Sequence, residues 1–75
     1  MYQFTKEQAI EFSEKRNWEP MSYQERAKFQ IEQKLLCMPF DIFHEAIEKT
    51  LGRPVYTHEF GLNMEGLRKA VNDIL

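Results

Sequence analysis

Cysteine, glycine and long apolar runs are all scarce in this 75-residue chain, and each shortage excludes something. Cys37 is the single cysteine, so an intramolecular disulfide is excluded and we expect a reducing compartment, the cytoplasm. With three glycines, the chain has no glycine-rich loop of the kind that binds phosphate. The longest apolar run, LLCMPF, is too short to span a membrane. The N-terminal MYQFTKEQ does not have the pattern of a secretory signal.

An excess of charge of one sign is also missing. The sequence has 10 Lys and Arg residues against 12 Asp and Glu, a net charge of −2, and its basic residues form no block. A nucleic-acid-binding domain normally carries a basic patch or stripe. We therefore predict that the protein binds neither nucleic acid nor a membrane, and nothing in the sequence indicates a cofactor.

The length predicts one small domain over residues 1–75. Area scaling gives a folded surface of about 4,900 Å², so roughly 60% of the unfolded surface would be buried. That is enough for one core but leaves little room for a separate buried active-site cleft. The size therefore favours a binding module over an enzyme.

Two capping boxes predict the first two helices. Thr5 in TKEQ precedes a predicted helix over about residues 6–16, and Ser22 in SYQE precedes one over about residues 23–37. Both sequences place Gln or Glu three residues after the hydroxyl, where it can bond back to the N-cap backbone.

The second half of the chain predicts two further helices. Asp41 is a plausible N-cap for IFHEAIEKTL, and Gly52 with Pro54 would end that helix. Asn63 would cap a last helix, MEGLRKAVNDIL. The predicted fold is thus mostly α, a compact domain of three to four helices.

One β-like run could add a short two-stranded ribbon to the helices. The run PVYT, residues 54–57, is able to pair with YQF, residues 2–4, as a short two-stranded ribbon. A ribbon of this size would need the helices behind it for stability.

Helical spacing predicts one core from three apolar stripes. We expect Phe43 and Ile47 at its centre, fully buried. The stripes comprise Tyr23, Ala27, Ile31, Leu35 and Met38, then Phe40, Phe43, Ile47 and Leu51, then Leu67, Val71 and Ile74.

Two apolar residues do not fit these stripes. In a helix extending to residue 37, Phe29 and Leu36 would share a face opposite Ile31. Either the weakly amphipathic first helix covers them, with Phe12 or Trp18, or they are exposed for a partner. We predict a partner-binding or self-association surface formed by Phe29, Leu36 and Trp18.

Four residues form a candidate metal site. His44 and Glu48 are four apart on a predicted helix, a spacing that can place two ligands on one metal. His58 and Glu59 would complete a hydrolytic site, with Glu45 as a base. The alternative interpretation is structural: Glu48 pairs with Arg53 or caps charge at the surface, and His44 is a half-buried core residue. The structural interpretation is preferred, because no HExxH or CxxC pattern accompanies the pair.

The segment LLCMPFDIFHEAIEKTLGRPVYTHEF resembles a small family of phage and prophage proteins of unknown function. The shared pattern is Cys-x-Pro-Phe, then His-Glu, Leu-Gly-Arg-Pro and Thr-His-Glu. The residues that carry it are Cys37, Pro39, Phe40, His44, Glu45, Leu51, Gly52, Arg53, Pro54, Thr57, His58 and Glu59. The resemblance implies a phage origin and a location inside a bacterial cell, and it implies no activity.

The preferred hypothesis is therefore a non-enzymatic phage accessory protein that binds a host or phage protein, for example to inhibit a defence or replication factor. A metal-binding or hydrolytic domain and a self-associating module are the alternatives.

Overall fold

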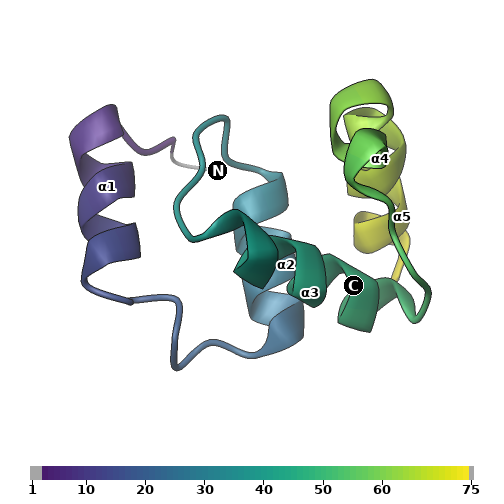
Figure 1. Cartoon of the computed structure of the whole chain (residues 1–75), viewed down its shortest axis with the longest axis horizontal. Coiled ribbons are helices and arrows are strands. Elements are labelled where there is room, and N and C mark those ends of the chain that lie inside the picture. Colours follow the sequence, from purple (N-terminus) through teal and green to yellow (C-terminus); the bar gives the residue numbers. More distant parts are fainter. Residues whose placement is uncertain (1–2, 75) are drawn as a thin grey trace.

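The computed structural model describes residues 3–74, and the mostly α prediction is confirmed (Figure 1). No strand occurs among these residues. The helices in chain order are α1 (Lys6–Glu14), α2 (Tyr23–Ile31), α3 (Phe40–Leu51), α4 (Thr57–Leu62) and α5 (Met64–Ile74). None of these helices is long and apolar enough to cross a membrane.

The helices follow one another across the long axis of the molecule. Figure 1 shows α1 at one edge, α2 and α3 in the middle, and α4 with α5 at the opposite edge. Helices α2, α3 and α5 contact one another, and α4 packs on α5. The accessible surface is 4962 Å², close to the expectation for a single compact domain of this length.

The core lies where α2, α3 and α5 meet, and the expectation for Phe43 and Ile47 is confirmed. Their exposed fractions are 3% and 0%. Partly buried residues that include Phe12 and Phe29 pack around this centre. The buried apolar cluster comprises Trp18, Ala27, Ile31, Met38, Phe43, Ala46, Ile47, Val55, Leu67 and Val71.

Both predicted capping boxes are present. The Thr5 hydroxyl accepts the backbone N–H of Gln8 at the start of α1, and the Ser22 hydroxyl accepts that of Glu25 at the start of α2. In turn, the Glu25 carboxylate accepts the Ser22 backbone N–H. This bond lowers the pKa of the Glu25 carboxyl.

The predicted extension of the second helix to Cys37 is wrong, because α2 ends at Ile31. The side chain of Gln30 folds back, donates to the Leu35 carbonyl at 2.9 Å and accepts the Cys37 N–H at 2.7 Å. From α5, Arg68 donates to the Ile31 carbonyl at the end of α2 at 3.2 Å. These tertiary bonds replace the helical bonds that propensity alone favours, so Leu35 leaves the predicted stripe and is 42% exposed.

The predicted ribbon of residues 2–4 and 54–57 is also wrong. The backbone N–H of Phe4 donates to the side-chain oxygen of Gln33, whereas that of Val55 donates to the Glu48 carboxylate. Each segment thus bonds to a different side chain, and no strand pairing joins residues 3–4 to residues 54–57. Tyr2 lies outside the described residues.

Asp41 does not cap the third helix. Helix α3 begins at Phe40, two residues before the predicted start, and its N-cap position is Pro39, which makes no side-chain cap bond. The extended backbone of Pro39, with ψ at 140°, turns the chain into the helix.

Gly52 ends α3 in the predicted way. Its φ is 70°, its N–H donates to the Glu48 carbonyl, and a Cβ added there would meet nothing within 4 Å. Glycine is therefore required here by the left-handed backbone conformation. It is not required by a steric clash with a neighbouring atom.

This geometry predicts opposite effects at two glycines. Gly52→Ala should lower the free energy of unfolding by about 1–2 kcal/mol, the cost of a left-handed non-glycine residue. Gly61, within α4, also has open space around its Cβ position, so Gly61→Ala should raise stability by up to about 1 kcal/mol. Urea denaturation of both variants checks this, and equal effects of the same sign would contradict it.

Candidate functional site

The joint between α3 and α4 is built around the peptide groups of Val55. One turn of α3 supplies both partners: His44 Nε2 bonds to the Val55 carbonyl, and the Glu48 carboxylate accepts the Val55 N–H at 2.9 Å. The two side chains also lie 3.5 Å apart. Because the carbonyl is only an acceptor, His44 donates from Nε2. The pair thereby holds Val55, which is 2% exposed, in the core.

A second set of bonds fixes the start of α4. The Glu59 carboxylate accepts the Tyr56 N–H at 3.0 Å and lies 3.4 Å from the Arg53 guanidinium. The bond from Tyr56 is the main cause of a lowered pKa for the Glu59 carboxyl, and Arg53 adds to it. Arg53 therefore pairs with Glu59, not with Glu48 as the structural interpretation expected.

Aromatic rings close the inner side of the joint. The Phe60 ring of α4 lies edge-on to Phe40 and Phe43 of α3, with centroids 5.0 and 5.3 Å apart. His44 is packed in the same group, 5.4 Å from Phe60. Phe40, which the sequence assigned to the core stripe, is at the rim and 37% exposed. The joint is thus held by bonds on one side and rings on the other.

The four residues of the candidate metal site are not assembled. His44 and Glu48 are engaged with Val55, while His58 stacks on Tyr56 on the exposed side of α4, with centroids 5.8 Å apart. Glu59 bonds to Arg53 and Tyr56. Within residues 3–74 no group of three or more His, Cys, Asp or Glu side chains is placed to hold a metal ion. The segment is a joint between helices.

The residues predicted to bind a partner do not share one face. Trp18 is buried at 5% exposure, and its indole N–H donates to the Ser13 carbonyl at 3.2 Å. Phe29 is half-buried and stacks on Phe12, so the first helix covers it. Leu36 is 52% exposed and lies in a loop, not on α2. The shared helix face was wrong because α2 ends before Leu36.

The loop of residues 32–39 is the second structured feature of the molecule. The Gln30 side chain bridges Leu35 and Cys37, as described above. From the other side, Gln3 donates to the Glu32 carbonyl at 2.6 Å and accepts the Lys34 N–H at 2.9 Å. Two glutamine amides thus hold the loop backbone at both ends.

Inside this loop, Cys37 is buried at 0% exposure and its thiol lies 3.3 Å from the Leu35 carbonyl. Burial raises the pKa of the Cys37 thiol. A thiol in this state is a poor nucleophile, so Cys37 acts as a small apolar core residue. Leu35 and Leu36, by contrast, are exposed to solvent, with exposed fractions of 42% and 52%.

The remaining residues of the phage-like pattern lie at the ends of helices or on the surface. Pro39 precedes α3 and Leu51 is half-buried near its end, whereas Glu45, Pro54 and Thr57 are exposed. The pattern therefore maps mainly onto the joint and the loop before it.

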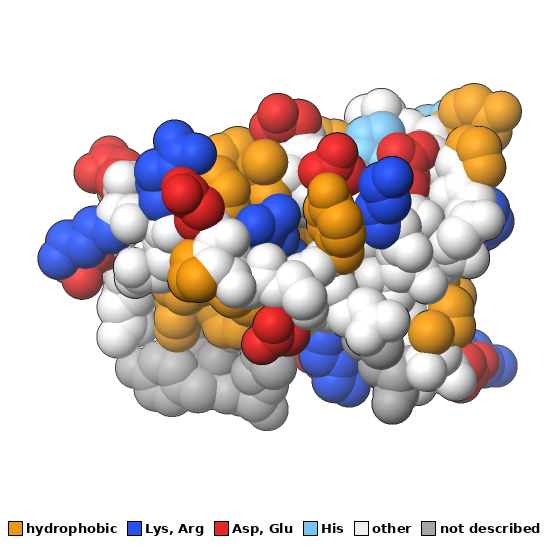
Figure 2. All heavy atoms as spheres, turned by 90° about the horizontal axis from the view of Figure 1, so that it is seen from below, with side chains coloured by type: hydrophobic (Ala, Val, Ile, Leu, Met, Phe, Trp, Pro, Cys, Tyr) orange, Lys and Arg blue, Asp and Glu red, His pale blue; other side chains and the backbone are white. Residues whose placement is uncertain are grey.

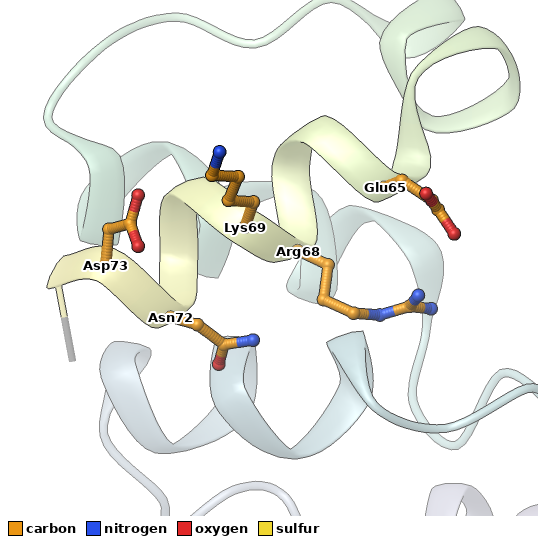
Figure 3. Close-up of a pocket in the computed structure, with 5 residues that line it drawn as sticks. All are labelled: Glu65, Arg68, Lys69, Asn72 and Asp73. Carbon is orange, nitrogen blue, oxygen red and sulfur yellow. The ribbon is translucent and has the colours of Figure 1, made fainter.

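Two of the surface depressions are open and lined largely by charged residues. One of about 410 Å³ is formed by Glu65, Arg68, Lys69, Asn72 and Asp73, which all project from α5 (Figure 3). Another, of about 390 Å³, lies beside the joint around Arg53 and Glu48. On the face in Figure 2, acidic and basic side chains are intermixed. Acidic and basic side chains thus occur together in each depression, so neither depression is lined by charges of one sign alone.

A family model for a domain of unknown function, DUF7736, matches residues 23–73. The chain belongs to this family. The match spans α2 to α5 and contains both the joint and the loop, while α1 lies outside it. No curated protein and no solved structure matches the chain significantly. The family description gives neither function nor source, so the phage origin stays a prediction.

The sequence did not indicate the role of the glutamines that hold the loop of residues 32–39. Gln3, Gln30 and Gln33 act through side-chain bonds to backbone groups up to 31 residues away. Glutamine is a strong helix former and common on surfaces, so no local pattern marks such a role. The adjacent pair Leu35 and Leu36 was the available signal, because one of two neighbouring leucines on a helix normally faces water.

Proposed function

We propose that this DUF7736 protein is a non-enzymatic accessory protein that binds a host or phage protein through Leu35 and Leu36. The exposure of both leucines on a loop held by glutamine side chains carries this proposal. Leu36 belongs to the surface predicted from the sequence. Leu35 replaces Trp18, which the fold buries, and Phe29, which the first helix covers.

The energetics of such a loop favour binding. Burying a leucine against a partner is worth roughly 1.5–3 kcal/mol. Because Gln3 and Gln30 already order the backbone, little conformational entropy would be lost on association. The ordered backbone would present both apolar side chains to a partner without first having to fold.

The resemblance of residues 37–59 to phage proteins supports a partner within a bacterial cell. We propose a cytoplasmic location on the same basis. An inhibitor of a defence or replication factor is one form that such a protein takes.

Affinity capture from bacterial lysate tests the proposal. The immobilised full chain should retain a partner, and Leu36→Asp should reduce the retained amount roughly ten- to hundredfold, the equivalent of losing one buried leucine. Ile74→Asp is the matched control, because Ile74 has the same exposed fraction of 52%. Circular dichroism verifies that both variants fold. Equal retention by Leu36→Asp and the intact chain would refute the proposed surface.

A further inference from the structure

Residues 3–14, here called the N-terminal arm, cover a face that belongs to the DUF7736 domain. The family match begins at residue 23, so the arm lies outside it. The covered face consists of Phe29, Gln33 and the backbone of residues 32–34. In Figure 1 the arm helix α1 forms one edge of the molecule and joins α2 through a single loop.

The face contacts both side chains and backbone of the arm. The Phe29 ring lies 5.4 Å from that of Phe4 and 5.0 Å from that of Phe12, measured between centroids. Gln33, only 6% exposed, accepts the Phe4 N–H at 3.0 Å. Gln3 forms two bonds with the backbone of residues 32–34, one as donor and one as acceptor. Together these contacts suit a Gln-Phe segment that leads into a helix with a second Phe.

Residues 15–17 form the hinge between the arm and the domain. Arg26 donates to the carbonyls of Trp18 and Glu19 at 2.9 and 2.8 Å, which fixes the chain from Trp18 onward to α2. Between this anchor and the end of α1 lie residues 15–17. Arg16 among them has φ at 56°, a left-handed conformation that is unfavourable for a residue with a side chain. The same conformation caps α1, because the Arg16 N–H bonds to the Ser13 carbonyl at 3.2 Å and the Asn17 N–H to the Phe12 carbonyl at 3.1 Å. Extension of the chain at this point would relieve the left-handed conformation and break these two bonds.

We propose that the arm exchanges between two copies of the chain, each arm docking on the Phe29 face of the other copy. An exchanged arm recovers the contacts of Gln3, Phe4 and Phe12 with identical partners, so only the hinge conformation differs between the two forms. Short hinges under strain favour this outcome. The site in the exchanged form is incomplete without the second copy.

A second copy suits this face because each copy carries the Gln3, Phe4 and Phe12 spacing that the face accommodates. The tethered arm has a high effective concentration, which favours the closed monomer in dilute solution. The exchanged dimer therefore gains population as protein concentration rises. It uses a different surface from Leu35 and Leu36, and so it does not depend on the proposed partner.

Hinge shortening tests the exchange. Removal of Lys15, Arg16 and Asn17 should prevent the arm from returning to its own domain while leaving it able to reach a second copy. By analytical ultracentrifugation, this chain should sediment with roughly twice the monomer mass at a concentration where the intact chain is monomeric. Phe4→Ala with Phe12→Ala in the same shortened chain removes the docking rings and should restore the monomer.

A folded but monomeric shortened chain would overturn the proposal. If the shortened chain does not fold, a labelled peptide of residues 3–14 decides the question. It should bind the full chain carrying Phe12→Ala, as measured by fluorescence anisotropy, and a peptide with both phenylalanines replaced should bind at least tenfold more weakly. Absence of binding, or binding unaffected by that replacement, would also overturn the exchange.

Discussion

Ile47→Ala should lower the free energy of unfolding by about 2–5 kcal/mol. Ile47 is 0% exposed and lies in the cluster formed by α2, α3 and α5. Truncation leaves a cavity among residues that cannot all relax into it. For a small domain this is a large part of the total stability.

Urea denaturation measures this loss, and Ile10→Ala provides the control. Ile10 is 45% exposed on α1, so its truncation should change stability by less than about 1 kcal/mol. An unchanged denaturation midpoint for Ile47→Ala would contradict the packing of the three helices.

Phe29→Asp should destabilise the fold by about 3 kcal/mol or more. The substitution removes a ring that contacts Phe4 and Phe12 and places a carboxylate between them. Without this contact the arm loses its apolar docking site on α2. The sequence instead predicted that Phe29 belongs to a partner-binding or self-association surface.

Gln24→Asp is the matched control for that experiment, because it adds the same charge at an exposed position of α2. Thermal unfolding followed by circular dichroism compares the two. If Phe29→Asp keeps the melting temperature of the intact chain, the ring is not part of the folded core.

Local signals determined those parts of the fold that were predicted correctly. The capping boxes at Thr5 and Ser22 start helices, and Gly52 ends one, because each acts through bonds within a few residues. The burial of Phe43 and Ile47 followed from helical spacing. The centre of the core was therefore accessible from the sequence, whereas Tyr23 and Ile74, also expected in its stripes, are 41% and 52% exposed.

The errors share a physical cause. The end of α2 at Ile31 depends on Arg68, which is 37 residues away, and on the folded-back side chain of Gln30. The cover over Phe29 comes from Phe12, which the sequence offered as the alternative to a partner surface, and from Phe4, which it did not indicate. Propensity and periodicity describe neighbours along the chain, so they do not indicate contacts of this kind.

The actual partners of His44 and Glu48 in the joint were not identified for a similar reason. The spacing of His44 and Glu48 does bring the two side chains together, 3.5 Å apart. Their common partner is the backbone at Val55, which no spacing rule identifies. His58 points to the other side of α4, where it stacks on Tyr56.

The methyl NMR signals of the full chain, recorded with and without the captured protein, test the central claim most directly. Binding through the glutamine-held loop predicts shifted or broadened signals for Leu35 and Leu36. The signals of Ile10 and Ile74, which are exposed to a similar degree on α1 and α5, should stay unchanged. Shifts at Ile10 or Ile74 with unchanged signals for both leucines would contradict the claim.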